Sequence, residues 1–147
     1  MRRISAGFLM VSTLLLTHHA LARDTEYHPK IDEVMKNGDF YLRVGPGVAF
    51  FFATQNPPAI DQTYGEFVTN RKTDSFGRSD EDACRWAMLS ALRELRDRAN
   101  QLGGDAVVNI VSYYKKKVVA SETDYECHAG EFVAGVALKG TVVKLKH

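Results

Sequence analysis

The sequence has little cysteine, no excess charge of one sign, and one long apolar run, near its start. It contains two cysteines and no Cys-x-x-Cys pair, so the usual thiol redox motif is absent. Lys and Arg number 19 against 18 Asp and Glu, and this balance gives no strong field for nucleic acid or anionic lipid. Beyond residue 22 no stretch is long and apolar enough to span a bilayer. We therefore expect no nucleic-acid partner and no stable membrane insertion.

Recognisable catalytic motifs are also missing. No glycine-rich stretch has the form G-x-x-x-x-G-K-[ST], and no serine lies in a G-x-S-x-G context. Beyond residue 22 the only histidines are His28, His128 and His147, so few general bases are available. We expect no enzyme, no catalytic residue and no cofactor, and specifically no ATPase or nuclease.

The first 22 residues have the pattern of a secretory signal peptide. Arg2 and Arg3 form a positive start, residues 6–16 are uncharged and apolar, and Ala20-Leu21-Ala22 is a small-x-small cleavage site. A transmembrane anchor is the alternative, but the apolar stretch is shorter than the roughly 20 residues that a bilayer requires. We predict cleavage after Ala22 and export to the periplasm, with release from the cell less expected. Cleavage removes two of the 19 basic residues and no acidic residue, which leaves 17 against 18 and a net charge of −1.

The two cysteines, Cys84 and Cys127, both lie in the part expected to be exported. An oxidising compartment favours a single intramolecular disulfide, and a small exported domain gains stability from it. A reactive thiol or a metal-ligating thiolate is the alternative, although the cysteines are far apart in the sequence.

The clearest secondary-structure signal is a helix that begins after Ser79. Ser79 is a favourable N-cap, Asp82 follows at the capping-box position, and Gly103 supplies a left-handed stop. Small and apolar residues between them recur at three- and four-residue spacing, which predicts one buried face along about 23 residues.

Short β-prone runs precede and follow this helix, so the order of elements predicts an α+β fold. We expect a flexible leader over residues 23–39, with a short helix near 31–36 as an option, and one domain over 40–147. That domain consists of one long helix packed on a mostly antiparallel sheet. Gly135 and Gly140 predict a bulge or a close backbone approach. The predicted strands are 40–44, 48–53, 65–73, 106–114, 118–123, 125–128, 131–138 and 140–145.

Residues 83–110 have the form A-x(7)-AL-x(6)-A-x(3)-GGDAVVNI, and the Cys127 segment and Ala134-Gly-Val-Ala-Leu-Lys-Gly-Thr141 follow. This pattern, over roughly residues 64–146, resembles the YbjQ-like and RcsF-like family of small domains. More narrowly, it resembles short exported proteins often labelled excinuclease ATPase subunits. The resemblance implies a helix packed on a sheet and supports a Cys84–Cys127 bridge by analogy. It supplies no catalytic residue, and this chain lacks the lipidated cysteine of the envelope sensor.

His128 is the one weak candidate for a metal ligand. It lies beside Cys127, with Asp124, Glu126 and Glu131 nearby in the sequence. Imidazole and carboxylates suit zinc or copper, but a surface or capped histidine is the simpler interpretation.

Three consecutive aromatic residues, Phe50 to Phe52, cannot all point into one core from a strand, so at least one is expected to be exposed or covered by a partner. Our first hypothesis is therefore a non-enzymatic binding or assembly module of the bacterial envelope. It would contact another envelope protein or a second copy through an aromatic surface or a sheet edge. The alternatives are a periplasmic metal-binding protein and a thiol redox protein.

Overall fold

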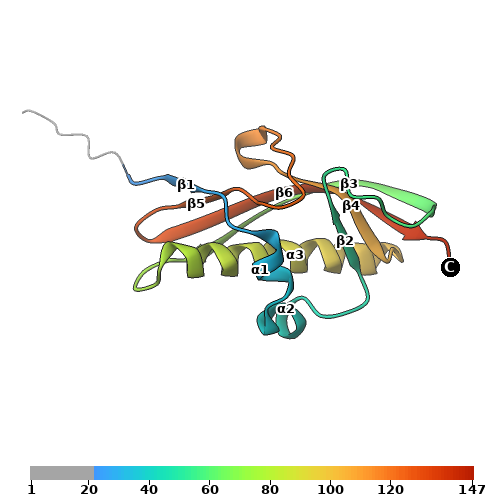
Figure 1. The fold of residues 1–147 in the computed structure, drawn as a ribbon, viewed down its shortest axis with the longest axis horizontal. Coiled ribbons are helices and arrows are strands. Elements are labelled where there is room, and N and C mark those ends of the chain that lie inside the picture. Colours follow the sequence, from blue (N-terminus) through green and yellow to red (C-terminus); the bar gives the residue numbers. More distant parts are fainter. Residues whose placement is uncertain (1–21) are drawn as a thin grey trace, which may run out of the picture.

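The computed structural model describes residues 22–147, which form an α+β domain with one long helix along one face of a sheet (Figure 1). The predicted signal peptide lies outside the described residues except for Ala22. No helix in the described part is long and apolar enough to cross a membrane. Within residues 22–147 the sheet has six strands: β1 (Thr25–Tyr27), β2 (Ala49–Phe52), β3 (Ile60–Asp74), β4 (Ala106–Ser112), β5 (Cys127–Ala129) and β6 (Val133–Leu145).

The long strand β6 is the centre of the sheet. β3 pairs with it antiparallel along nearly its whole length, from Ile60 opposite Leu145 to Asp74 opposite Val133. The other edge of β6 is shared by β5 and β4, both antiparallel. β1 pairs with β5, and β2 pairs with β4 in the one parallel pair of this sheet. The prediction of a mostly antiparallel sheet is therefore confirmed.

The predicted long helix is α3 (Asp80–Leu102), and its ends are those expected from the sequence. The Ser79 hydroxyl accepts a hydrogen bond from the Asp82 N–H, and Gly103 ends the helix with a φ of 79°. The apolar stripe of α3 is buried against the sheet, with Met88 and Leu95 among its largest members. Local capping and periodicity together were sufficient to define this element.

Two short helices occupy the segment before β2: α1 (Ile31–Met35) and α2 (Gly38–Arg43). The prediction of a strand over residues 40–44 is wrong. The Asn37 side chain caps α2 by accepting the Asp39 N–H, and the buried residues are Phe40 and Val44, four apart. That spacing is one face of a helix, whereas a strand would also turn Leu42 inward, and Leu42 is 84% exposed.

Residues 23–39 form β1, α1 and the start of α2 rather than a flexible leader, and the short helix considered near residues 31–36 is present as α1. β1 extends the sheet beside β5, and the Arg23 guanidinium donates two hydrogen bonds to the Asp80 carboxylate at the start of α3. The Tyr27 hydroxyl also donates to Asp80, over 2.6 Å. These contacts span more than 50 residues of sequence, so no local pattern indicated them.

Residues 113–126 form a loop rather than the extended strands predicted there. A 3-10 turn, η1 (Tyr114–Lys116), replaces the end of the predicted strand 106–114. The two strands predicted over 131–145 are one continuous strand, β6. The close approach expected at Gly140 is confirmed, because a Cβ there would lie 2.7 Å from Cγ1 of Val107 on β4.

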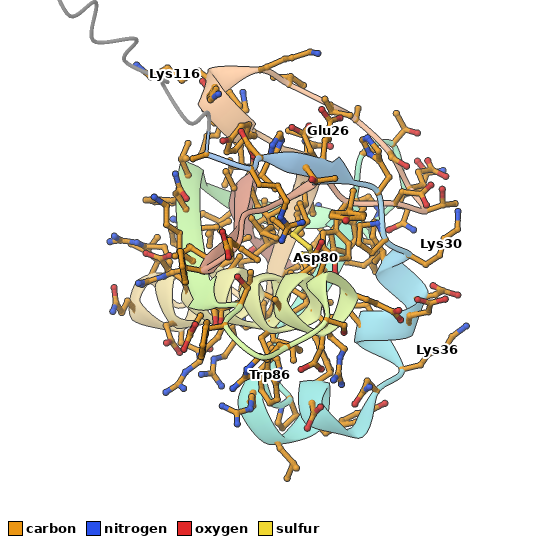
Figure 2. The ribbon with its side chains drawn as sticks, turned by 90° about the vertical axis from the view of Figure 1, so that its left-hand side faces the viewer. Glu26, Lys30, Lys36, Asp80, Trp86 and Lys116 are labelled. Atoms are coloured by element: carbon orange, nitrogen blue, oxygen red, sulfur yellow. A yellow bond between two sulfur atoms is a disulfide. The ribbon has the colours of Figure 1, made fainter. Side chains whose placement is uncertain are left out.

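The three consecutive phenylalanines are divided between two apolar clusters. Phe50 and Phe52 contact the main core beneath α3, and Phe51 contacts a smaller cluster that includes Val143. The expected exposed aromatic patch at these residues is wrong, because none of the three is exposed. Trp86, which lies beside the helix stripe, is on the side of α3 that faces α2 (Figure 2). The Arg43 guanidinium covers its ring at 3.9 Å from the ring centre.

Candidate functional site

The β1–β5 ribbon brings ligand-type side chains onto one face of the sheet. Glu26 lies directly opposite His128 in the antiparallel register, and Glu126 is two residues before His128. Because side chains alternate along a strand, these three point to the same side. Cys127 points to the other side, toward α3. In Figure 2, Glu26 lies on the side of the sheet away from α3.

The three side chains form a compact cluster of possible ligands. One oxygen of Glu26, one of Glu126 and one ring nitrogen of His128 all lie within 4.8 Å of one another. His128 Nε2 is 2.6 Å from Glu126 Oε1, and His128 Nδ1 is 3.0 Å from Asp24 Oδ1. His28 lies next to this group, with its Nε2 2.8 Å from Glu26 Oε1.

Each ring nitrogen of His128 therefore faces a carboxylate oxygen. Carboxylates accept hydrogen bonds and donate none, so both contacts are hydrogen bonds only when both ring nitrogens carry a proton. A cation bound between Nε2 and Glu126 would take the place of one of these protons. A hydrogen bond from the ring nitrogen that does not bind the metal fixes the orientation of a metal-binding histidine, and the contact between Nδ1 and Asp24 is of this kind.

The loop between β4 and β5 covers His128 and Glu126, whereas Glu26 stays exposed. The Tyr114 ring stacks on the His128 imidazole with 3.5 Å between ring centres and 13° between planes. Lys115 and Lys116 follow with positive φ angles of 49° and 64°, which turn the loop back over the ribbon. Figure 2 shows the Lys116 loop above Glu26. As a result, the Glu126 side chain is 6% exposed and the His128 side chain 12% exposed.

An opening beside the cluster gives a route from solvent. A cavity of about 360 Å³ reaches His128 and is also lined by Asp24, Tyr114 and Phe132. The buried Glu126 is held from behind, because its N–H donates to the Ser112 hydroxyl on β4 over 2.9 Å. The cluster is therefore positioned by three strands and remains open on one side.

A disulfide fixes β5 to the long helix. Cys84 of α3 and Cys127 of β5 are bonded with 2.00 Å between sulfurs, as the sequence predicted. Both cysteines are fully buried, and no free cysteine occurs in the described part of the chain. Thiol exchange needs access for an attacking thiolate, so this burial favours a structural role.

The segment that supplies Glu26 is anchored at its start by an ionic contact. Hydrogen bonds from Arg23 and then from Tyr27 lower the pKa of Asp80 to about 2. The same contacts raise the pKa of Arg23 and of Tyr27. The Asp80 carboxylate thus holds β1 against the start of α3 while it is ionised (Figure 2).

Sequence reasoning found part of the cluster. The structure brings His128 and Glu126 together, as considered, but Asp124 instead pairs with Lys30 at 2.6 Å and Glu131 is exposed outside the cluster.

Asp24 and Glu26 were not predicted from the sequence, and His28 was expected in a flexible leader. The signal that could have indicated them is the alternation Asp24-Thr-Glu26-Tyr-His28, which puts three ligand-type residues on one face of a strand.

Comparisons of the chain with protein-family models, with curated proteins and with solved structures give no match. The resemblance to the YbjQ-like family therefore stays a prediction. The fold brings ligand-type chemistry together above all in the cluster of Glu26, Glu126 and His128, in which Glu126 and His128 are largely covered and Glu26 is exposed.

Proposed function

We propose that this protein is a non-enzymatic, metal-binding protein of the bacterial envelope that takes Zn²⁺ or Cu²⁺ at Glu26, Glu126 and His128. The observation that carries the proposal is the placement of an imidazole nitrogen and two carboxylate oxygens within 4.8 Å of one another on the β1–β5 ribbon. Imidazole and carboxylate are the ligand types that these two ions share.

The imidazole nitrogen of His128 favours a first-row ion over a hard cation such as Ca²⁺. Ligands at about 2.0–2.2 Å from a tetrahedral zinc lie about 3.4 Å from one another. Small side-chain rotations would bring the three atoms to that spacing. Three protein ligands leave one position for water or for His28, which already contacts Glu26 and is half exposed.

Several features around the cluster support binding rather than chance proximity. Asp24 orients the His128 ring through Nδ1 and leaves Nε2 directed at Glu126. Tyr114 excludes water from one face of the imidazole. The buried disulfide and the predicted signal peptide both support an oxidising compartment outside the cytoplasm.

Isothermal titration with ZnCl₂ and with CuSO₄ at neutral pH tests the proposal. We expect one site per chain, and we expect Glu126→Gln and His128→Ala each to weaken binding by at least about tenfold, because each removes a ligand. Glu122→Gln and His147→Ala make the same chemical changes outside the cluster and should bind as the wild type does.

The proposal also predicts that any protons held by the ligand atoms are released on binding, since a metal ion takes imidazole and carboxylate only in their deprotonated forms. Titration in two buffers of different ionisation enthalpy measures that release. Failure of the wild type to bind either ion, or equal affinity of the cluster variants and their controls, would refute the metal site.

A further inference from the structure

A second feature, independent of the metal cluster, is the free edge of β3. β3 pairs with β6 on one side, and no other strand among residues 22–147 pairs with it. The register with β6 is regular from Gly65 to Asp74, so no bulge interrupts this edge over these ten residues. A long unpaired edge presents a row of unsatisfied N–H and C=O groups that another strand can pair with.

The backbone direction identifies which groups face outward. Ser75 donates its N–H to Phe132 on the β6 side, and hydrogen bonding alternates along an antiparallel pair. The N–H and C=O groups of residues 66, 68, 70 and 72 therefore point away from β6. The side chains of these four residues are all exposed, whereas Thr69 and Arg71 turn toward Glu94 of α3.

We propose that two copies of this chain associate through an antiparallel β3–β3 pair with its two-fold axis at Thr69. In this register Glu66 lies opposite Lys72 of the second copy, and the pair occurs twice because the interface is isologous. On the α3 side, Phe67 lies opposite Arg71 of the second copy. The Phe67 ring already makes a cation–π contact within its own chain, with the Arg98 guanidinium 5.0 Å from the ring centre.

The neighbouring registers lack this complementarity. An axis at Asn70 places Glu66 opposite Asp74, a like-charge pair that destabilises a sheet. An axis at Val68 places Glu66 opposite the uncharged Asn70. Charge complementarity therefore selects a second copy of this chain as the partner and also fixes the register.

Space for the added strand exists beside the edge. A groove of about 500 Å³ runs between β3 and α3, lined by Arg71, Arg93, Glu94 and Arg98 among others. The side chains of a paired strand that face α3 would enter this groove. The cluster at Glu26, Glu126 and His128 lies on β1 and β5, and β6 separates it from this edge. Lys72 of β3 also lines the cavity that reaches His128, so the interface borders that opening.

Sedimentation velocity of the purified protein, with its disulfide intact, tests the proposal across the micromolar range. We expect a concentration-dependent dimer. Glu66→Lys and Lys72→Glu should each raise the dissociation constant by at least about tenfold, because each turns two attractive pairs into two repulsive ones. The double variant Glu66→Lys/Lys72→Glu restores both pairs and should dimerise as the wild type does. Lys116→Glu, the same charge change on a distant loop, should have no effect.

A backbone variant tests the edge itself. The N–H of Val68 faces outward, so Val68→Pro removes an edge donor without breaking the β6 ladder. It should abolish the dimer while the melting temperature of the monomer changes little. A wild type that stays monomeric, or a double charge variant as weak as the single ones, would overturn the proposal.

Discussion

Gly140 shows how closely β4 and β6 approach at one residue. A Cβ at this position would lie 2.7 Å from Cγ1 of Val107 and 3.1 Å from Cγ1 of Ile110, and both neighbours are fully buried. Gly140→Ala should lower the free energy of unfolding by about 1–3 kcal/mol, because the packed strand cannot move aside. Urea unfolding with far-UV circular dichroism measures this loss.

Gly135, on the same strand, is the matched control. A Cβ there meets Cγ of Lys72 at 3.6 Å and the Arg71 carbonyl oxygen at 3.7 Å, both ordinary contacts. Gly135→Ala should leave stability unchanged or raise it slightly, since alanine has less freedom in the unfolded chain. Equal effects of the two substitutions would contradict the steric explanation.

At the same scale, single residues of the candidate site were only partly predictable. His128 and Glu126 are two apart and were recognised together. Glu26 is about 100 residues away and becomes their neighbour only because β1 pairs with β5 in one register. Asp124 was as plausible as Glu126 by sequence distance, but it lies beside Lys30, which lowers its pKa.

Among the elements, β1 is the one whose attachment depends on ionisation. The pKa of Asp80 is about 2 in the folded protein because Arg23 and Tyr27 donate to it, against about 3.9 in an unfolded chain. A carboxyl group whose pKa is lowered by folding contributes stability that is fully present at a pH above its pKa in the unfolded chain. That contribution is lost as the pH falls from about 4 to about 2.

Asp80→Asn should therefore flatten the dependence of unfolding free energy on pH in this acid range. The variant should also speed hydrogen exchange of the β1 amides at neutral pH, because Arg23 loses its partner. The protection factors of these amides in the wild type should fall to those of the variant only in acid. An identical pH slope in the two proteins would show that Asp80 does not hold β1.

The slope does not vanish in the variant, because Asp105 also has a pKa of about 2. Burial raises the pKa of the Asp105 carboxyl, but hydrogen bonds from the Leu145 backbone N–H and from the side chains of His147 and Lys144 lower it by more.

For the whole molecule, the Cys84–Cys127 bridge is the main covalent constraint. It joins residues 43 apart in the sequence. Closing a loop of this length lowers the entropy of the unfolded chain, which raises the free energy of unfolding by about 4 kcal/mol. Cys84→Ala/Cys127→Ala should lower the unfolding free energy by about 2–5 kcal/mol, measured by guanidinium unfolding. A reductant should destabilise the wild type by a similar amount and leave the double variant unaffected. If the variant is as stable as the oxidised wild type, the bridge is not a stabilising constraint.

The sequence alone determined the features that depend on neighbouring residues. The Ser79 cap, the apolar stripe and the Gly103 stop define α3. Each of these signals relates residues about one helical turn apart, so local rules were sufficient. The pairing of Cys84 with Cys127 also followed once a disulfide was expected, because two cysteines allow only one intramolecular bridge.

Only the tertiary structure decided which distant segments meet. Residues 23–39 are polar and their strand is three residues long, so its formation depends on β5 and Asp80 rather than on its own propensity. Phe40–Val44 is β-prone by composition, yet burial of one helical face overrode that propensity. The cluster of Glu26, Glu126 and His128 and the free edge of β3 both arise from strand order and register. These depend on packing across the whole chain, which local sequence patterns do not encode.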